Sequence, residues 1–229
     1  MIDAPPLLVF DLDGTLAETA GDLIGTLNFI LGKEGIAPLP LSDARFMLGA
    51  GAKALIERGY AAQNVHLDPA RLQRLFDDFL AHYEARIADE SHLFPGVVAA
   101  LDQFEAASWA FAVCTNKVEG PARKLLKALG VADRFRVIVG QDTFAIAKPD
   151  PRILEKTIDA AGGDPRRSIM VGDSRTDIDT ARNLGIPVVA VDFGYTDIPV
   201  RDLRPDCAIS HFDALWDAVR TLEFARSPT

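Results

Sequence analysis

Short apolar runs bounded by turn residues recur along this chain, and helical patterns lie between most of them. Buried strands that alternate with helices are typical of a parallel sheet with helices on both faces. The sequence therefore predicts an α/β protein. The expected strands are Leu7–Phe10, Phe111–Val113, Val137–Val139, Ile169–Val171, Val188–Val191 and Ala208–Ile209.

One long region interrupts this alternation, because no convincing strand occurs between residues 15 and 89. Within it, the run RLQRLFDDFLAHY at residues 71–83 places apolar side chains at helical spacing. We interpret Phe76, Phe79 and Tyr83 of this run as the packing face of a helix. The predicted division is an α/β core domain of residues 1–15 and 90–229, with a helical insertion of residues 16–89.

The composition excludes several classes of partner. Of the 229 residues, 48% are hydrophobic and 25% charged, which is typical of a soluble globular protein. The net charge of −9 disfavours nucleic acid or an anionic membrane as a partner. No apolar run approaches the roughly 18 residues that span a bilayer. Two cysteines, Cys114 and Cys207, make no disulfide framework, so we expect a reducing, cytoplasmic location.

Polar side chains gather where the predicted strands end. In an open parallel sheet, ligands bind beyond the carboxyl ends of the strands, so we expect these side chains to share one crevice. Carboxylates gathered there repel one another unless a divalent cation holds them, and a ligand set of oxygens alone suits Mg²⁺. The polar residues are Asp11, Asp13, Thr115, Asn116, Lys148, Asp173 and Asp177.

Each of these groups also has a purely structural explanation. An Asp-x-Asp-Gly sequence favours a turn, Ser174 and Asp177 can form a capping box, and Lys148 can be a solvated surface lysine. These explanations are independent of one another, whereas a site requires all the groups in this order at the strand ends. Their conjunction favours a site. The sequence Gly49-x-Gly51-x-Lys53 follows no predicted strand, and we interpret it as a turn.

Four motifs then suggest a family. DLDGTL, CTNK, KPDP and GDSRTD occur in this order on the expected elements, and the chain resembles the haloacid dehalogenase-like phosphatase superfamily. The resemblance implies a doubly wound, Rossmann-like core with the first strand in the centre. The insertion resembles the helical cap of the subgroup that contains phosphoglycolate phosphatases, β-phosphoglucomutases and phosphonatases. The stretches HLFPGV, VCTNK, VGDSRTDI and VDFGYTD look most like phosphoglycolate phosphatases.

The resemblance implies a role for each catalytic residue. Asp11 would be the nucleophile, and Asp13 would act as general acid and then as general base. Thr115 and the backbone amide of Asn116 would bind phosphoryl oxygens. Lys148 would offset charge on Asp11 and on the transferring phosphoryl group. An aspartate at position 13 favours a phosphate ester as the substrate.

The resemblance also implies a Mg²⁺ site. The Asp11 carboxylate, the Asp13 backbone carbonyl and Asp173 would hold the metal, with Asp177 supporting it through waters. Where many relatives continue with Asp-Ser after the first motif, this chain has Glu18-Thr19. Because that position leads into the cap, we expect it to affect substrate contacts rather than the chemistry.

The substrate is the least constrained expectation. Overall resemblance favours a small phosphorylated metabolite such as 2-phosphoglycolate, whose carboxylate needs a donor such as Arg45, Lys53 or Lys117. The alternatives are a phosphatase for other sugar phosphates or for pyrophosphate, a β-phosphoglucomutase-like mutase, or a phosphoacceptor signalling module. We expect either a monomer or a homodimer.

Overall fold

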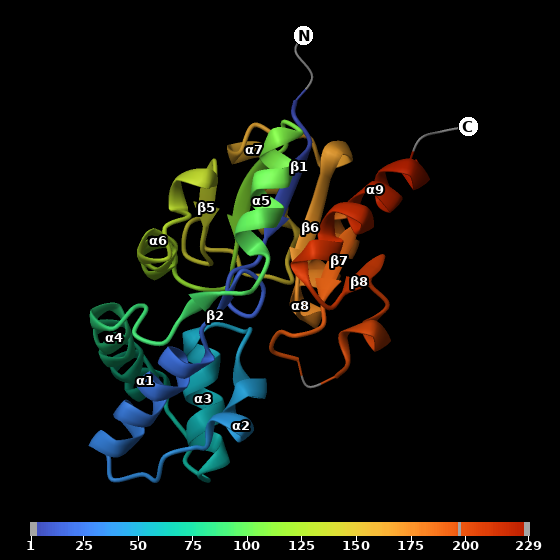
Figure 1. The fold of residues 1–229 in the computed structure, drawn as a ribbon. Coiled ribbons are helices and arrows are strands. Elements are labelled where there is room, and N and C mark those ends of the chain that lie inside the picture. Colours follow the sequence, from blue (N-terminus) through green and yellow to red (C-terminus); the bar gives the residue numbers. More distant parts are fainter. Residues whose placement is uncertain (1–3, 197, 227–229) are drawn as a thin grey trace.

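The computed structural model describes residues 4–196 and 198–226, and its centre is a six-stranded parallel sheet. The strands lie in the order β5-β4-β1-β6-β7-β8, so β1 lies between β4 and β6 (Figure 1). The prediction of a doubly wound α/β fold with a central first strand is confirmed. The bounds are β1 Leu7–Phe10, β4 Ala110–Cys114, β5 Val137–Val139, β6 Ser168–Gly172, β7 Val188–Val191 and β8 Cys207–Ile209.

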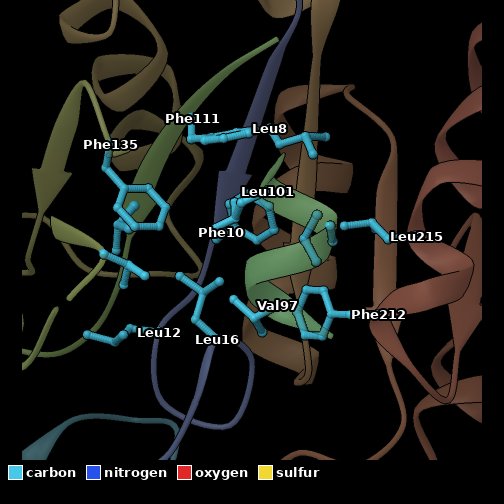
Figure 2. Packing of buried hydrophobic residues seen from close by; sticks show 14 of the residues in the cluster. Leu8, Phe10, Leu12, Leu16, Val97, Leu101, Phe111, Phe135, Phe212 and Leu215 are labelled. Atoms are coloured by element: carbon cyan, nitrogen blue, oxygen red, sulfur yellow. The ribbon is translucent and has the colours of Figure 1, made fainter. Parts of the chain in front are cut away.

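All four residues of β1 are buried, which explains why this strand has no polar side. Leu8 and Phe10 face one hydrophobic cluster, and Leu7 and Val9 face another on the opposite side of the sheet. Figure 2 shows Phe10 beside Leu101 and near Phe135 in the first cluster. A strand buried on both faces needs a continuous apolar run, as the sequence has.

Helices cover both faces of the sheet. On one face α5, α6 and α9 pack over Leu8 and Phe10, and on the other face α7 and α8 pack over Leu7 and Val9. Within residues 4–196 and 198–226, no helix is both long enough and apolar enough to cross a membrane. The bounds are α5 Val97–Ala106, α6 Glu119–Ala128, α7 Pro151–Ala160, α8 Arg175–Leu184 and α9 Leu215–Arg226.

The inserted region forms a helical block with its own hydrophobic cluster, and it lies beside the carboxyl end of the sheet (Figure 1). Asp68 caps the helix that was expected around residues 71–83 by accepting a hydrogen bond from the Arg71 amide, and Pro69 is its first residue. The helices of this block, which we call the cap, are α1 Ala20–Lys33, α2 Leu41–Ala44, α3 Ala52–Ala62 and α4 Pro69–Ala85.

The expectation that residues 15 to 89 contain no strand is wrong. Two short strands, β2 (Ala17–Glu18) and β3 (His92–Leu93), pair antiparallel where the chain enters and leaves the cap. Two residues are too few for a periodic pattern, so only the pairing itself defines these strands.

Candidate active site

Three buried carboxylates meet at the carboxyl end of the central strands. Asp11 directly follows β1, Asp173 directly follows β6, and Asp177 lies in the first turn of α8. One carboxylate oxygen from each lies within 4.8 Å of the other two, a grouping that could hold a metal ion. The chain thus brings together three of the four aspartates expected at the strand ends.

Lys148 lies between two of these carboxylates. Its Nζ is 3.0 Å from Asp11 Oδ1 and 2.5 Å from Asp177 Oδ1, and its side chain is fully buried. Burial opposes the charged ammonium, but Asp11 and Asp177 together raise the pKa of Lys148 above its ordinary value. Lys148 is therefore a permanent cation here and not a solvated surface lysine.

One ammonium does not compensate three buried carboxylates. Burial raises the pKa of Asp11 to about 6; Lys148 opposes this rise, while the nearby Asp177 adds to it. Burial, followed by repulsion from Asp177 and Asp11, also raises the pKa of Asp173. The excess of buried negative charge fits a hard divalent cation such as Mg²⁺.

The position of Asp173 is fixed by residues from two separate segments of the chain. Its Oδ1 accepts a hydrogen bond from Thr15 Oγ1 at 2.9 Å, and its Oδ2 accepts one from the Tyr195 amide at 2.6 Å. Gly14 passes so close that an added Cβ would lie 2.6 Å from Asp173 Oδ2, and its φ of +83° also favours glycine. Sequence reasoning assigned no such role to Thr15 or Tyr195, although both lie within the stretches DLDGTL and VDFGYTD.

Asp177 both caps a helix and faces the group of buried carboxylates, the two positions that the sequence allowed for it. With Ser174 it forms the capping box of α8, and its Oδ2 accepts a hydrogen bond from Ser174 Oγ at 2.7 Å. Its Oδ1 faces Lys148 Nζ at the same time. The helix cap therefore also holds this carboxylate toward the site.

Asp13 lies apart from the three grouped carboxylates, on the cavity described below. Both of its carboxylate oxygens accept hydrogen bonds from Lys117 Nζ, at 3.0 and 3.1 Å, and Oδ1 also accepts one from Thr19 Oγ1 at 2.8 Å. Thr19 of the Glu18-Thr19 departure thus contacts Asp13 directly, and the expected effect of this position on substrate contacts stays a prediction. The metal role implied for Asp13 uses its backbone carbonyl and stays a prediction.

Thr115 and Asn116 follow β4 and are both buried. The Asn116 side chain accepts a hydrogen bond from the Lys148 amide at 2.9 Å and donates one to the Lys148 carbonyl at 3.3 Å. It thereby fixes the segment that carries the Lys148 ammonium. Its amide group also approaches the Gly49 carbonyl of the cap at 3.4 Å.

A cavity lies between the core and the cap over these residues. The core contributes Asp11, Asp13, Thr115, Asn116 and Lys117, and the cap contributes mainly apolar residues. Neither Arg45 nor Lys53 is among the described residues that line it. The cap residues that form the wall are Leu23, Leu48, Gly49, Gly51, Ala52, Leu55, Phe79, Leu80 and Tyr83.

Comparison with known proteins then decides the family. The model of the haloacid dehalogenase-like hydrolase family matches residues 8–191. The chain belongs to this family. It is 51% identical over 210 residues to a phosphoglycolate phosphatase from Mesorhizobium japonicum, covering 92% of each chain, and 45% identical over 214 residues to one from Agrobacterium fabrum, covering 93% of this chain and 92% of the relative.

A solved structure agrees with this assignment. The crystal structure of a predicted phosphoglycolate phosphatase from Haemophilus somnus superposes with a TM-score of 0.87 at 26% identity, over 96% of this chain and all of the other. The resemblance inferred from the sequence is therefore confirmed. This member of the haloacid dehalogenase-like family is an enzyme, a hydrolase of the phosphatase type.

Proposed function

We propose that this enzyme is a Mg²⁺-dependent phosphomonoesterase that acts through an aspartyl-phosphate on Asp11, with 2-phosphoglycolate as its substrate. The observation that carries the chemistry is Asp11 itself: a buried carboxylate at the end of the central strand, beside Lys148 and grouped with two other aspartates. The substrate rests on the names of relatives up to 51% identical to this chain.

The reaction would have two steps: transfer of the phosphoryl group to Asp11, and hydrolysis of the resulting aspartyl-phosphate. An Asp11 oxygen attacks phosphorus and the ester P–O bond breaks, while Asp13 donates its proton to the leaving alkoxide oxygen. A water then attacks the phosphorus of the aspartyl-phosphate and gives its proton to Asp13. Orthophosphate leaves and the Asp11 carboxylate is restored.

Charge around the reacting phosphorus is balanced from the core. Asp11, Asp173 and the Asp13 backbone carbonyl would hold Mg²⁺, with Asp177 behind them. When bound, the metal would offset negative charge on the phosphoryl group. Lys148 holds a fixed positive charge beside Asp11, and Thr115 would donate a hydrogen bond to a phosphoryl oxygen.

The two sides of the cavity differ in chemistry. The charged and polar lining residues come from the core, and the cap wall above them is largely apolar. A phosphoryl group bound on the core side would therefore place the organic part of the substrate beneath the cap.

The test is phosphate release with and without Mg²⁺ from 2-phosphoglycolate, glucose 1-phosphate, nucleoside monophosphates and pyrophosphate. We expect Mg²⁺-dependent release that favours 2-phosphoglycolate and is abolished in Asp11→Asn. Faster release from another ester would replace the proposed substrate but keep the chemistry. An isomer formed from glucose 1-phosphate would favour a mutase, and a phosphoaspartate that lasts for minutes would favour a signalling module. Cytoplasmic location, and a monomer or homodimer, stay predictions.

A further inference from the structure

Tyr83 stands out on the cap side of the cavity because its hydroxyl is buried and makes no hydrogen bond within the described part of the chain. The side chain is 1% exposed, comes from the last turn of α4, and lines the cavity together with Asp11 and Asp13. Among the described residues its hydroxyl has no hydrogen-bond partner. A buried hydroxyl left unpaired costs free energy, which a ligand that supplies an acceptor recovers.

Lys117 lies over the ring of Tyr83 and supplies a positive charge to the cavity wall. Its Nζ is 4.4 Å from the centre of the Tyr83 ring and is buried with it. Among the described lining residues no other lysine or arginine occurs. Lys117 holds both oxygens of Asp13, so the ammonium lies between the proposed acid and the cap.

The other two cations considered for substrate recognition are engaged elsewhere. Arg45 pairs with Glu18 at 2.7 Å and stacks over the Tyr195 ring at 4.8 Å. The Lys53 ammonium donates to Gln73 Oε1 at 2.8 Å in an exposed position. Neither presents its charge to the cavity.

We infer that Lys117 and Tyr83 together form the subsite that binds the carboxylate of the substrate, and so determine its specificity. This inference rests on the proposed function. An ammonium and a neighbouring hydroxyl donor match the two oxygens of a carboxylate. Burial raises the pKa of Tyr83 to about 12, with Lys117 opposing this rise, so the hydroxyl keeps its proton at neutral pH and donates.

A carboxylate fits this subsite better than a second phosphoryl group. One ammonium already shared with Asp13, and one hydroxyl, offer little compensation for a dianion in a wall that is otherwise apolar on the cap side.

The test compares 2-phosphoglycolate with 2-hydroxyethyl phosphate, which carries a hydroxymethyl group in place of the carboxylate. In Tyr83→Phe we expect kcat/KM for 2-phosphoglycolate to fall about 10-fold, mainly through KM, with little change for 2-hydroxyethyl phosphate. In Lys117→Met the ratio of the two kcat/KM values should fall by at least about 30-fold. Taking the ratio removes any effect of Lys117 on Asp13, which acts on both esters alike.

Matched controls keep the test specific. Tyr60→Phe removes the hydroxyl of another buried cap tyrosine, which is not among the described cavity residues, and Lys53→Met removes an exposed cap lysine. Both should keep the wild-type ratio. The midpoint of urea unfolding of Tyr83→Phe should not fall, because the lost hydroxyl makes no hydrogen bond to any described residue. This variant therefore remains informative if Lys117→Met fails to fold.

The outcomes separate the two proposals. A wild-type enzyme that prefers 2-phosphoglycolate, with the same preference in Tyr83→Phe and Lys117→Met, would overturn the subsite alone. A wild-type enzyme with no preference between the two esters would overturn the proposed substrate and, with it, the carboxylate ligand. Faster turnover of ethane-1,2-diol bisphosphate, lost in both variants, would assign the subsite to a phosphoryl group and overturn the carboxylate.

Discussion

Replacing the proposed nucleophile should stabilise the metal-free protein. Burial raises the pKa of Asp11 from 3.8 to about 6 in the folded chain. A folded-state pKa above the unfolded value means that the free energy of unfolding falls as the pH rises from about 4 to about 6, and the loss is complete above that range. A difference of about two pKa units corresponds to about 3 kcal/mol. Asp11→Asn removes the charge while keeping the shape.

The assay is urea unfolding with a chelator present, followed by circular dichroism. At pH 8 the variant should be more stable than the wild type by up to about 3 kcal/mol, and at pH 4 the two should be nearly equal. Adding Mg²⁺ at pH 8 should then stabilise the wild type more than the variant, because ligand binding to the folded state adds to its stability. Activity should be lost throughout.

The pH dependence distinguishes this explanation from simple repacking. Asp150→Asn serves as the control, because Asp150 caps α7 at a half-buried position and asparagine is an equally good cap. That control should gain no stability at pH 8. A variant of Asp11 that is no more stable than the wild type at pH 8, or that gains the same amount at pH 4, would refute the electrostatic argument.

Two further predictions concern Lys148 in the site and Phe79 in the cap. Lys148→Ala should lower kcat by about 10²- to 10³-fold, since it removes the cation beside Asp11 and Asp177; steady-state phosphate release measures this, and a loss below 10-fold would contradict the proposed role. Phe79→Ala should lower the free energy of unfolding by about 3 to 5 kcal/mol, because this buried side chain belongs to the hydrophobic cluster of the cap. Urea unfolding measures it, and a change below 1 kcal/mol would show that the cap cluster contributes little.

The sheet could be predicted from the sequence because its strands are buried on both faces. Continuous apolar runs such as Leu7–Phe10 and Val188–Val191 coincide with β1 and β7 residue for residue. The helices of the cap followed from spacing and from the Asp68-Pro69 start. Elements as short as β2 and α2 were not predicted, because two to four residues are too few to show a periodic pattern of apolar side chains.

The grouping of Asp11, Asp173 and Lys148 could also be foreseen, because parallel strands bring their carboxyl ends to one edge. The function of Tyr83 could not. Helical spacing predicts only that a side chain turns inward, and it is the same for a residue that packs against neighbours and for one that also lines a cavity. Likewise, the sequence offered Arg45, Lys53 and Lys117 as equals, and only tertiary contacts separate them.

The pairing of β2 with β3 has a consequence for how such a protein can change. Glu18 is paired with His92. The chain therefore leaves the core and returns to it at two paired residues, whose Cα atoms lie about 5 Å apart. A two-residue hairpin turn can bridge that gap, and a longer insertion costs little more closure entropy than a short one. Residues 19–91 could therefore be replaced by another insertion while Asp11 and Asp173 keep their places at the ends of β1 and β6.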